Sequence, residues 1–217
     1  MKLFYAEPDF RQSVNEMGFN IVKQAAQSMN CILRTFQTRN TSFSIKCLKS
    51  FVRSKLEYGS QIWSPYQLDD IDLIESVQSE FTRCIPAIKK YIKKQKLKKE
   101  SFTYPYPKRL KALKMDALEI RRIRADLAMT YKMYHEKVNI NFNDFFTVDT
   151  YQKTRSNGLK LKCEKSRLDI RKYSFSVRTA KVWNQLPPQV VLAKSLKAFH
   201  TEFNKTDLTR FTRGRTL

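Results

Sequence analysis

The sequence predicts a mainly α-helical protein, a helical bundle with a short β-hairpin-like element near residues 154–172. Glycine is scarce, with four among 217 residues, so few tight reversals of the backbone are available and a many-stranded sheet is disfavoured. Aromatic residues make up 12% of the chain, which is typical of a folded protein rather than a disordered one. Apolar residues recur at three- and four-residue steps in several segments, as they do on the buried face of a helix. The length allows one good-sized domain or two small ones.

Two helices are predicted near the start of the chain. The first spans residues 9–36, with Asp9 as its N-cap. The second begins at Thr41 or Ser42, either of which can cap it, and breaks near Gly59.

A third helix is predicted to open at Asp69 and Asp70 and to be interrupted by Pro86. We interpret these acids, with Asp72, as a cap and first-turn charges that complement the positive end of the helix dipole, rather than as a metal-binding pair. The apolar stripe of this helix comprises Leu73, Ile74, Val77, Phe81 and Ile85.

The second half of the chain opens with a short helix over residues 108–113. The strongest predicted helix begins at Asp116, and a short anchoring turn follows at residues 144–146. A turn at Asn157-Gly158 then introduces the strand-like alternation of the hairpin element.

Two further helices are predicted to close the chain. One covers about residues 174–186 and stops at Pro187, and the other carries Leu196, Phe199 and Phe203. We divide the chain into a helical region at 1–88, a basic linker at 89–107 and a C-terminal helical region with short strands at 108–217, and we expect the basic tail to be loose.

The strongest functional indication is the net charge of +22. Self-repulsion at this charge is usually relieved by a polyanion. Nucleic acid is therefore the first candidate partner and an anionic membrane surface the second. Ribosomal or histone-like packing would show the same balance.

The remaining composition favours an intracellular protein without a metal or a cofactor. The four cysteines, Cys31, Cys47, Cys84 and Cys163, are far apart and form no CxxC pair, so we expect reduced and mostly buried thiols. No stretch approaches the roughly 20 apolar residues of a membrane span, and the first residues lack the apolar core of a signal peptide. We expect a nuclear or cytoplasmic location and no cofactor.

No arrangement of residues indicates catalysis. The sequence contains neither GxGxxG nor GKS/GKT, so no phosphate-binding loop is indicated. The acids lie at helix starts or among basic residues, and not in the clusters that a two-metal site requires. His135 lies far from His200 in sequence, and we interpret it as a cap that stabilises the helix dipole.

Residues 88–99, which read IKKYIKKQKLKK, are the clearest binding motif. Lysines at this density displace the counterions of a polyanion, so we expect salt-sensitive binding that is indifferent to nucleotide sequence. A solvated linker or a nuclear-localisation signal is the alternative interpretation. The lysines concerned are Lys89, Lys90, Lys93, Lys94, Lys96, Lys98 and Lys99.

A second basic cluster lies later in the chain and includes Tyr173 and Phe175. Arginine among aromatic rings suits stacking on unpaired bases, but the rings can equally belong to the core. We assign Phe175 and Trp183 to the core. The basic members are Lys160, Lys162, Lys165, Arg167, Arg171, Lys172 and Arg178.

Several segments together resemble the region downstream of the catalytic palm in LINE-type (non-LTR) retrotransposon reverse transcriptases. They are IVKQAAQSMNCILRTF (21–36), LKSFVRSKLEYGSQIWSPY (48–66), DDIDLIESVQSEFTRCI (69–85), PKRLKAL (107–113), LEIRRIRADLAMTYKMYH (118–135) and the run from Arg167 to Phe203 with its Trp-Asn-x-Leu-Pro helix end. They follow the family's order along nearly the whole chain. The basic run at 88–99 departs from the family, in which a shorter and less basic link is usual.

The resemblance implies a thumb-like region at 1–88 and a C-terminal region that together grip template and primer. The metal-binding aspartates of the family's palm would lie before Met1, so the resemblance implies RNA-directed DNA polymerase activity only with a missing palm. The residues that would carry the grip are Arg53, Lys55, Arg83, Arg121, Arg122, Arg167, Arg171, Lys172 and Arg178.

Three functions therefore stay open. The first is a non-catalytic nucleic-acid-binding remnant of such a reverse transcriptase, which binds the backbone of RNA, DNA or a hybrid. The second is a polymerase fragment, and the third is a basic helical scaffold for an acidic partner or a membrane surface.

Overall fold

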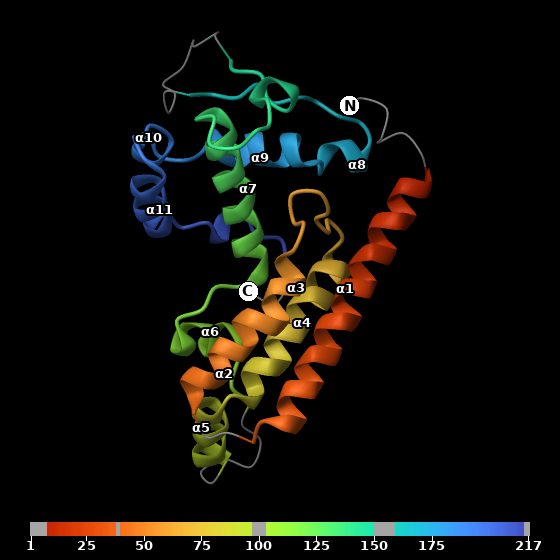
Figure 1. Ribbon diagram of the computed structural model, residues 1–217, viewed down its shortest axis with the longest axis vertical. Coiled ribbons are helices and arrows are strands. Elements are labelled where there is room, and N and C mark those ends of the chain that lie inside the picture. Colours follow the sequence, from red (N-terminus) through yellow and green to blue (C-terminus); the bar gives the residue numbers. More distant parts are fainter. Residues whose placement is uncertain (1–7, 38–39, 97–102, 150–158, 215–217) are drawn as a thin grey trace. The chain divides into compact units, whose positions relative to one another are not determined.

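The structure, a computed structural model, is mainly helical, as predicted (Figure 1). It describes residues 8–37, 40–96, 103–149 and 159–214, which fall into two compact units. As far as they are described, the N-terminal unit comprises residues 12–59, 65–121 and 213–217, and the C-terminal unit comprises residues 1–11, 60–64 and 122–212. Helix α7 (Leu118–Tyr134) begins in the first unit and continues in the second.

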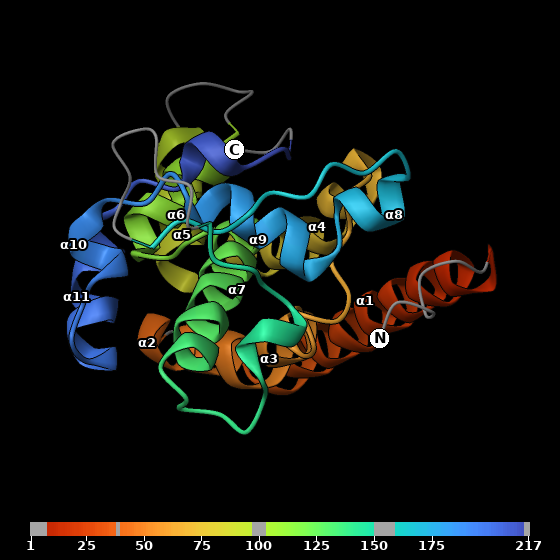
Figure 2. The same ribbon diagram turned by 90° about the horizontal axis from the view of Figure 1, so that it is seen from above.

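The N-terminal unit is built from helices around an apolar core. It contains most of α1 (Pro8–Thr35), α2 (Thr41–Cys47), the π-helical segment η1 (Leu48–Arg53), α3 (Ser54–Glu57), α4 (Leu68–Cys84), α5 (Pro86–Lys96) and α6 (Tyr106–Leu113). Helix α1 lies beside the α2–η1–α3 segment (Figures 1 and 2), where Lys55 Nζ donates to Ser28 Oγ at 2.7 Å. The core includes Val52, Leu56 and Phe81, each at most 1% exposed.

The C-terminal unit is organised around α7. Its other elements are η2 (Phe142–Asp144), α8 (Asp169–Lys172), α9 (Phe175–Trp183), α10 (Pro188–Val191), α11 (Leu196–Lys205) and η3 (Thr209–Phe211). The Tyr131 hydroxyl donates to Ala193 O at 2.6 Å, and its ring stacks on Phe199 of α11. Trp183 is fully buried and donates its indole N–H to Leu159 O, while Phe175 is 8% exposed. The assignment of both rings to the core is confirmed.

The second predicted helix is divided into α2, η1 and α3, and its cap differs from the prediction. Asn40, rather than Thr41 or Ser42, is the N-cap, because its side chain accepts a hydrogen bond from Phe43 N at 3.1 Å. The helix ends at Glu57, and Gly59 follows with a φ of 65°, a conformation that glycine adopts without strain.

Helix α4 differs from its predicted stripe at one position. Leu73 is 40% exposed, whereas the polar residues Glu75 and Gln78 are buried at 2% and 0%. Pro86 ends α4 as predicted, but it also opens α5, which fits the preference of proline for the first helical turn.

The predicted hairpin at 154–172 is not formed as a strand pair in the described residues. An isolated antiparallel bridge joins Val148 to Leu161, and residues 169–172 form helix α8 instead of a strand. The predicted turn at Asn157-Gly158 lies outside the described residues.

The basic stretch at 89–107 lies inside the N-terminal unit. Its residues as far as Lys96 belong to α5, and α6 begins at Tyr106. Along the sequence, the boundaries between the two compact units lie on either side of residues 60–64 and between Arg121 and Arg122.

The tail was expected to be loose, but its described residues are held in place. The backbone N–H groups of Arg213 and Gly214 donate to the two carboxylate oxygens of Glu119 at 2.7 and 2.9 Å, and Arg213 Nη1 donates to Tyr66 O at 2.9 Å. A Cβ at Gly214 would lie 3.1 Å from both Glu119 Oε2 and Ile71 Cγ2, so the backbone of residue 214 lies close to these two side chains.

We expect Glu119→Ala to lower the free energy of unfolding by about 1–3 kcal/mol, because two donors lose a charged acceptor and the N-terminus of α7 loses an acidic residue. Urea denaturation measures this change. Glu202→Ala is the matched control, since it removes a carboxylate that pairs with Lys205 on the surface, a contact worth less than about 1 kcal/mol. Equal losses in the two variants would contradict the role of Glu119 in holding residues 213 and 214 in place.

Candidate nucleic-acid interface

Helix α5 carries a dense row of exposed cations. Lys89, Lys90, Lys93 and Lys94, which we call the lysine face, are all exposed. At 3.6 residues per turn they cover an arc of about 140° of the helix surface. No acidic residue occurs in α5. The side chains of Lys96, Lys98 and Lys99, predicted as part of the same site, lie outside the described ones.

The opposite side of α5 fixes the orientation of the lysine face. Ile85 and Ile88 are buried, and Ile92 is half-buried. The backbone N–H of Ala87 donates to Thr41 Oγ1 at 3.2 Å, which ties the start of α5 to α2. The apolar side thus holds α5 on the N-terminal unit, and the lysines are directed to solvent.

Two tyrosines lie at the border of the lysine face. The ring centroids of Tyr91 and Tyr104 are 4.6 Å apart with an interplanar angle of 35°, and Tyr91 is 41% exposed. This aromatic pair was not among the predicted site residues. The signal that could have found it is the tyrosine at the centre of the lysine run, together with the Tyr-Pro that follows it.

Two arginines predicted to bind nucleic acid are used within the N-terminal unit. Arg53 is buried and Arg121 is half-buried, and both pair with the carboxylate of Glu57. Burial lowers the pKa of Arg53, and the neighbouring Arg121 guanidinium lowers it further. Glu57 therefore serves as a shared counterion for two guanidinium groups.

Arg109 is a buried arginine that sequence reasoning missed. It is 2% exposed and donates to Tyr104 O at 2.5 Å, to Ser79 O at 3.0 Å and to Ser79 Oγ at 2.7 Å. Burial lowers its pKa, and the nearby Arg83 adds to this effect. Arg109 joins α4 to the start of α6.

A buried carboxylate lies beside this arginine network. Glu75 accepts hydrogen bonds from the Tyr106 hydroxyl and from Leu118 N, the latter at 2.9 Å. Burial raises the pKa of Glu75 to about 6, although these hydrogen bonds oppose the rise. The side chain connects α4 to α6 and to the start of α7.

Two further predicted arginines make contacts within the C-terminal unit. Arg122 is 5% exposed, with its guanidinium 4.0 Å from the Trp63 ring centroid, and it donates to Trp63 O. Arg178 makes a two-pronged ion pair with Asp126, at 2.8 and 3.1 Å. It also donates to the backbone oxygens of Tyr173, Ser60 and Gln61.

The second basic cluster is partly neutralised. Arg171 pairs with Glu164 at 2.5 Å, and Lys172 lies 3.8 Å from Asp169. The cluster members Lys162, Lys165 and Arg167 are exposed, whereas Lys160 is half-buried.

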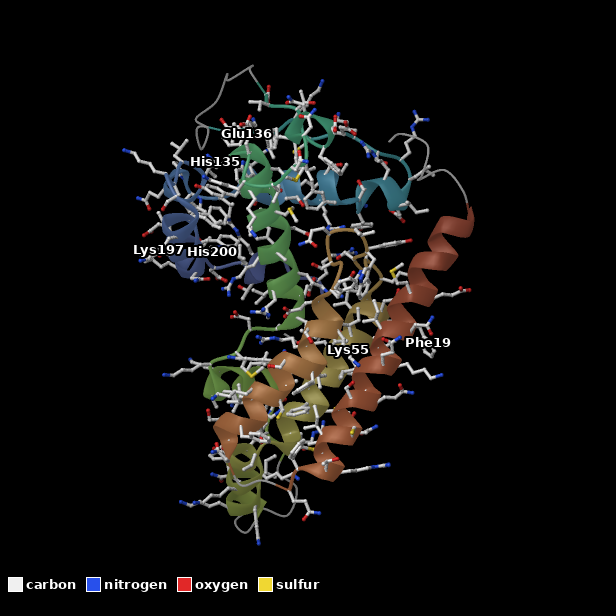
Figure 3. The ribbon with its side chains drawn as sticks, viewed as in Figure 1. Phe19, Lys55, His135, Glu136, Lys197 and His200 are labelled. Carbon is white, nitrogen blue, oxygen red and sulfur yellow. The ribbon has the colours of Figure 1, made fainter. Side chains whose placement is uncertain are left out.

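Two further residues of the N-terminal unit that were predicted to contact nucleic acid are also exposed. Lys55 extends from α3 towards α1 (Figure 3) and donates to Ser28 Oγ. Arg83 lies in the last turn of α4, shortly before α5. Of the predicted set with described side chains, the exposed members are Lys55, Arg83, Lys89, Lys90, Lys93, Lys94 and Arg167.

The side chains that could bind a metal ion do not cluster in the described part of the chain. No group of three histidine, cysteine or acidic side chains there could hold a metal ion. All four cysteines are free thiols, but only Cys47 is buried, so the expectation of mostly buried cysteines is wrong.

The two histidines lie on different helices. His135 lies at the end of α7 and His200 on α11 (Figure 3). Partial burial lowers the pKa of His135, as does the Lys137 ammonium, and its Nε2 is buried without a hydrogen-bond partner. The neutral imidazole is therefore favoured, which argues against the predicted role as a charged cap.

A scan against family models, a search of curated proteins and a search of solved structures found no match to this chain. Among the described helices, none is both long enough and apolar enough to cross a bilayer.

Proposed function

We propose that the chain binds nucleic acid through the phosphate backbone, with the lysine face of α5 as the central contact, and that it catalyses no reaction on its own. The observation that carries the proposal is the exposure of four lysines on one side of a helix whose other side is buried. A rigid row of cations of this kind neutralises successive phosphates and releases their counterions.

The cost of this arrangement in the unbound protein supports the same interpretation. Lys89 and Lys93 are four residues apart, as are Lys90 and Lys94, so each pair of like charges lies on adjacent turns. Such pairs destabilise a helix by roughly 0.2–0.5 kcal/mol each, and a bound polyanion removes the repulsion.

The measurement that tests the proposal is the salt dependence of binding to a single-stranded oligonucleotide. Four phosphate contacts give a slope of log Kobs against log salt of about −3. We expect replacement of the four lysines of the lysine face by glutamine to reduce the slope by about that amount and to weaken binding at low salt.

The control replaces four other exposed lysines, which lie on the C-terminal unit, by glutamine. These are Lys137, Lys181, Lys194 and Lys197. The control changes the net charge by the same four units, so equal effects of the two variants would contradict a specific role for α5. A shallow salt slope in the unmodified protein would contradict backbone binding altogether. Binding to anionic vesicles in preference to RNA at physiological salt would favour the membrane alternative.

We also propose that the chain derives from the post-palm region of a LINE-type reverse transcriptase, and that it retains the grip of that region on nucleic acid. The family-like order of segments from residue 21 to Phe203 supports this origin. The test is the genomic sequence upstream, where we expect a reading frame, intact or decayed, that encodes the palm aspartate motif. Unrelated upstream sequence at several independent copies would contradict it.

A further inference from the structure

The tyrosine pair at the edge of the lysine face has a supported geometry. Tyr104 precedes Pro105, which keeps it out of the helical conformation, and its carbonyl accepts a hydrogen bond from the buried Arg109. Arg109 is in turn held by Ser79 of α4. The ring of Tyr91 thus rests on a residue whose backbone is anchored to the core of the N-terminal unit.

Tyr91 borders the lysine face directly. At 3.6 residues per turn, its direction differs from that of Lys94 by about 60° around the helix axis. Tyr91 is 41% exposed although the ring of Tyr104 packs against it at a tilt of 35°. An aromatic surface therefore remains open to solvent within reach of a strand whose phosphates lie on the lysines.

We propose that Tyr91, supported from behind by Tyr104, stacks on an unpaired base, so that the preferred ligand of this site is single-stranded nucleic acid. The inference rests on the proposed function and specifies its ligand. Lysines contact phosphates of single strands and duplexes alike, whereas the bases of a duplex are already stacked on one another and do not present a face to a side chain.

The other basic cluster does not offer the same surface. Phe175 is buried, and the Tyr173 ring has Lys172 Nζ 5.2 Å from its centroid. The combination of an exposed, supported ring with several exposed lysines is found on α5.

The test compares Tyr91→Leu with Tyr91→Phe on two ligands of equal length, an oligouridylate and a blunt RNA duplex, over the same series of salt concentrations. We expect Tyr91→Leu to weaken binding to the single strand roughly tenfold and to leave duplex binding unchanged. The salt slope on the single strand should stay the same, because the phosphate contacts remain. Tyr91→Phe keeps the ring and should bind as the unmodified protein does.

Tyr58→Leu provides the matched control, since Tyr58 is 79% exposed and lies outside α5. An oligodeoxynucleotide of abasic sites, which keeps the phosphates and lacks the bases, should bind equally to the unmodified protein and to Tyr91→Leu. Equal weakening on single strand and duplex, no weakening on the single strand, or an equal effect of Tyr58→Leu would overturn the stacking proposal. Failure of the proposed function gives a different result from failure of the stacking proposal. If the lysine face does not bind nucleic acid, the variant without it binds both ligands as the unmodified protein does.

Discussion

Arg178→Ala is expected to be among the most destabilising single substitutions in the C-terminal unit, at about 3–5 kcal/mol of unfolding free energy. Asp126 is 5% exposed, and burial raises its pKa while the Arg178 guanidinium opposes the rise. Removal of the guanidinium leaves this carboxylate without its two-pronged partner. Three backbone carbonyls, at Tyr173, Ser60 and Gln61, lose a donor at the same time.

Urea denaturation of a double-mutant cycle measures the effect. Asp126→Asn combined with Arg178→Ala should be less destabilising than the sum of the single changes, because the buried Asp126 charge that the Arg178 guanidinium compensates is removed together with its partner. Arg178→Lys keeps the charge but loses the planar arrangement of donors, so we expect an intermediate loss. A loss below about 1 kcal/mol in Arg178→Ala would contradict a structural role. That role also predicts that loss of binding in this variant accompanies unfolding.

The second large effect is a pH dependence of stability that originates at Glu75. Its pKa in the folded protein is about 6, above the ordinary value of 4.5, so the folded state holds the proton more tightly than the unfolded state does. Protonation therefore stabilises the fold, and this contribution is lost as pH rises from 4.5 through 6. A difference of 1.5 pKa units corresponds to about 2 kcal/mol at 1.36 kcal/mol per unit.

Glu75→Gln removes this titration. The unfolding free energy of the unmodified protein minus that of the variant should therefore fall by about 2 kcal/mol between pH 4.5 and pH 7. Tyr106→Phe removes a hydrogen bond that lowers the pKa of Glu75, so in that variant the loss should be larger and should extend to higher pH. A difference that stays constant across this range would show that Glu75 titrates normally.

The helices were largely predictable because periodicity is a local property of the chain. Residues 9–36 correspond to α1 (Pro8–Thr35), and residues 108–113 fall within α6 (Tyr106–Leu113). The turn expected at 144–146 overlaps η2, and Phe146 is buried as an anchor should be. The division of the second helix into α2, η1 and α3 was not predictable, since π-helical hydrogen bonding leaves no comparable sequence period.

The roles of the arginines were less predictable, because they depend on partners far away in sequence. Arg178 pairs with Asp126 across 52 residues, and Arg109 binds Ser79 across 30. From composition alone, every arginine is a candidate to bind a polyanion. The lysines of α5 were predictable because a long amphipathic run directs its cations to one side, and lysine is seldom buried without a partner.

The order in which the chain contributes to its two compact units has a practical consequence for experiments with fragments. Neither unit is a continuous stretch, since residues 60–64 belong to one and the flanking residues to the other. A fragment that ends between residues 89 and 105 lacks Tyr106 and Leu118, the partners of Glu75, and also Arg121, a partner of Glu57. A deletion that removes these partners would thus be expected to destabilise the N-terminal unit. Mapping of the binding surface should therefore use point substitutions in the intact chain.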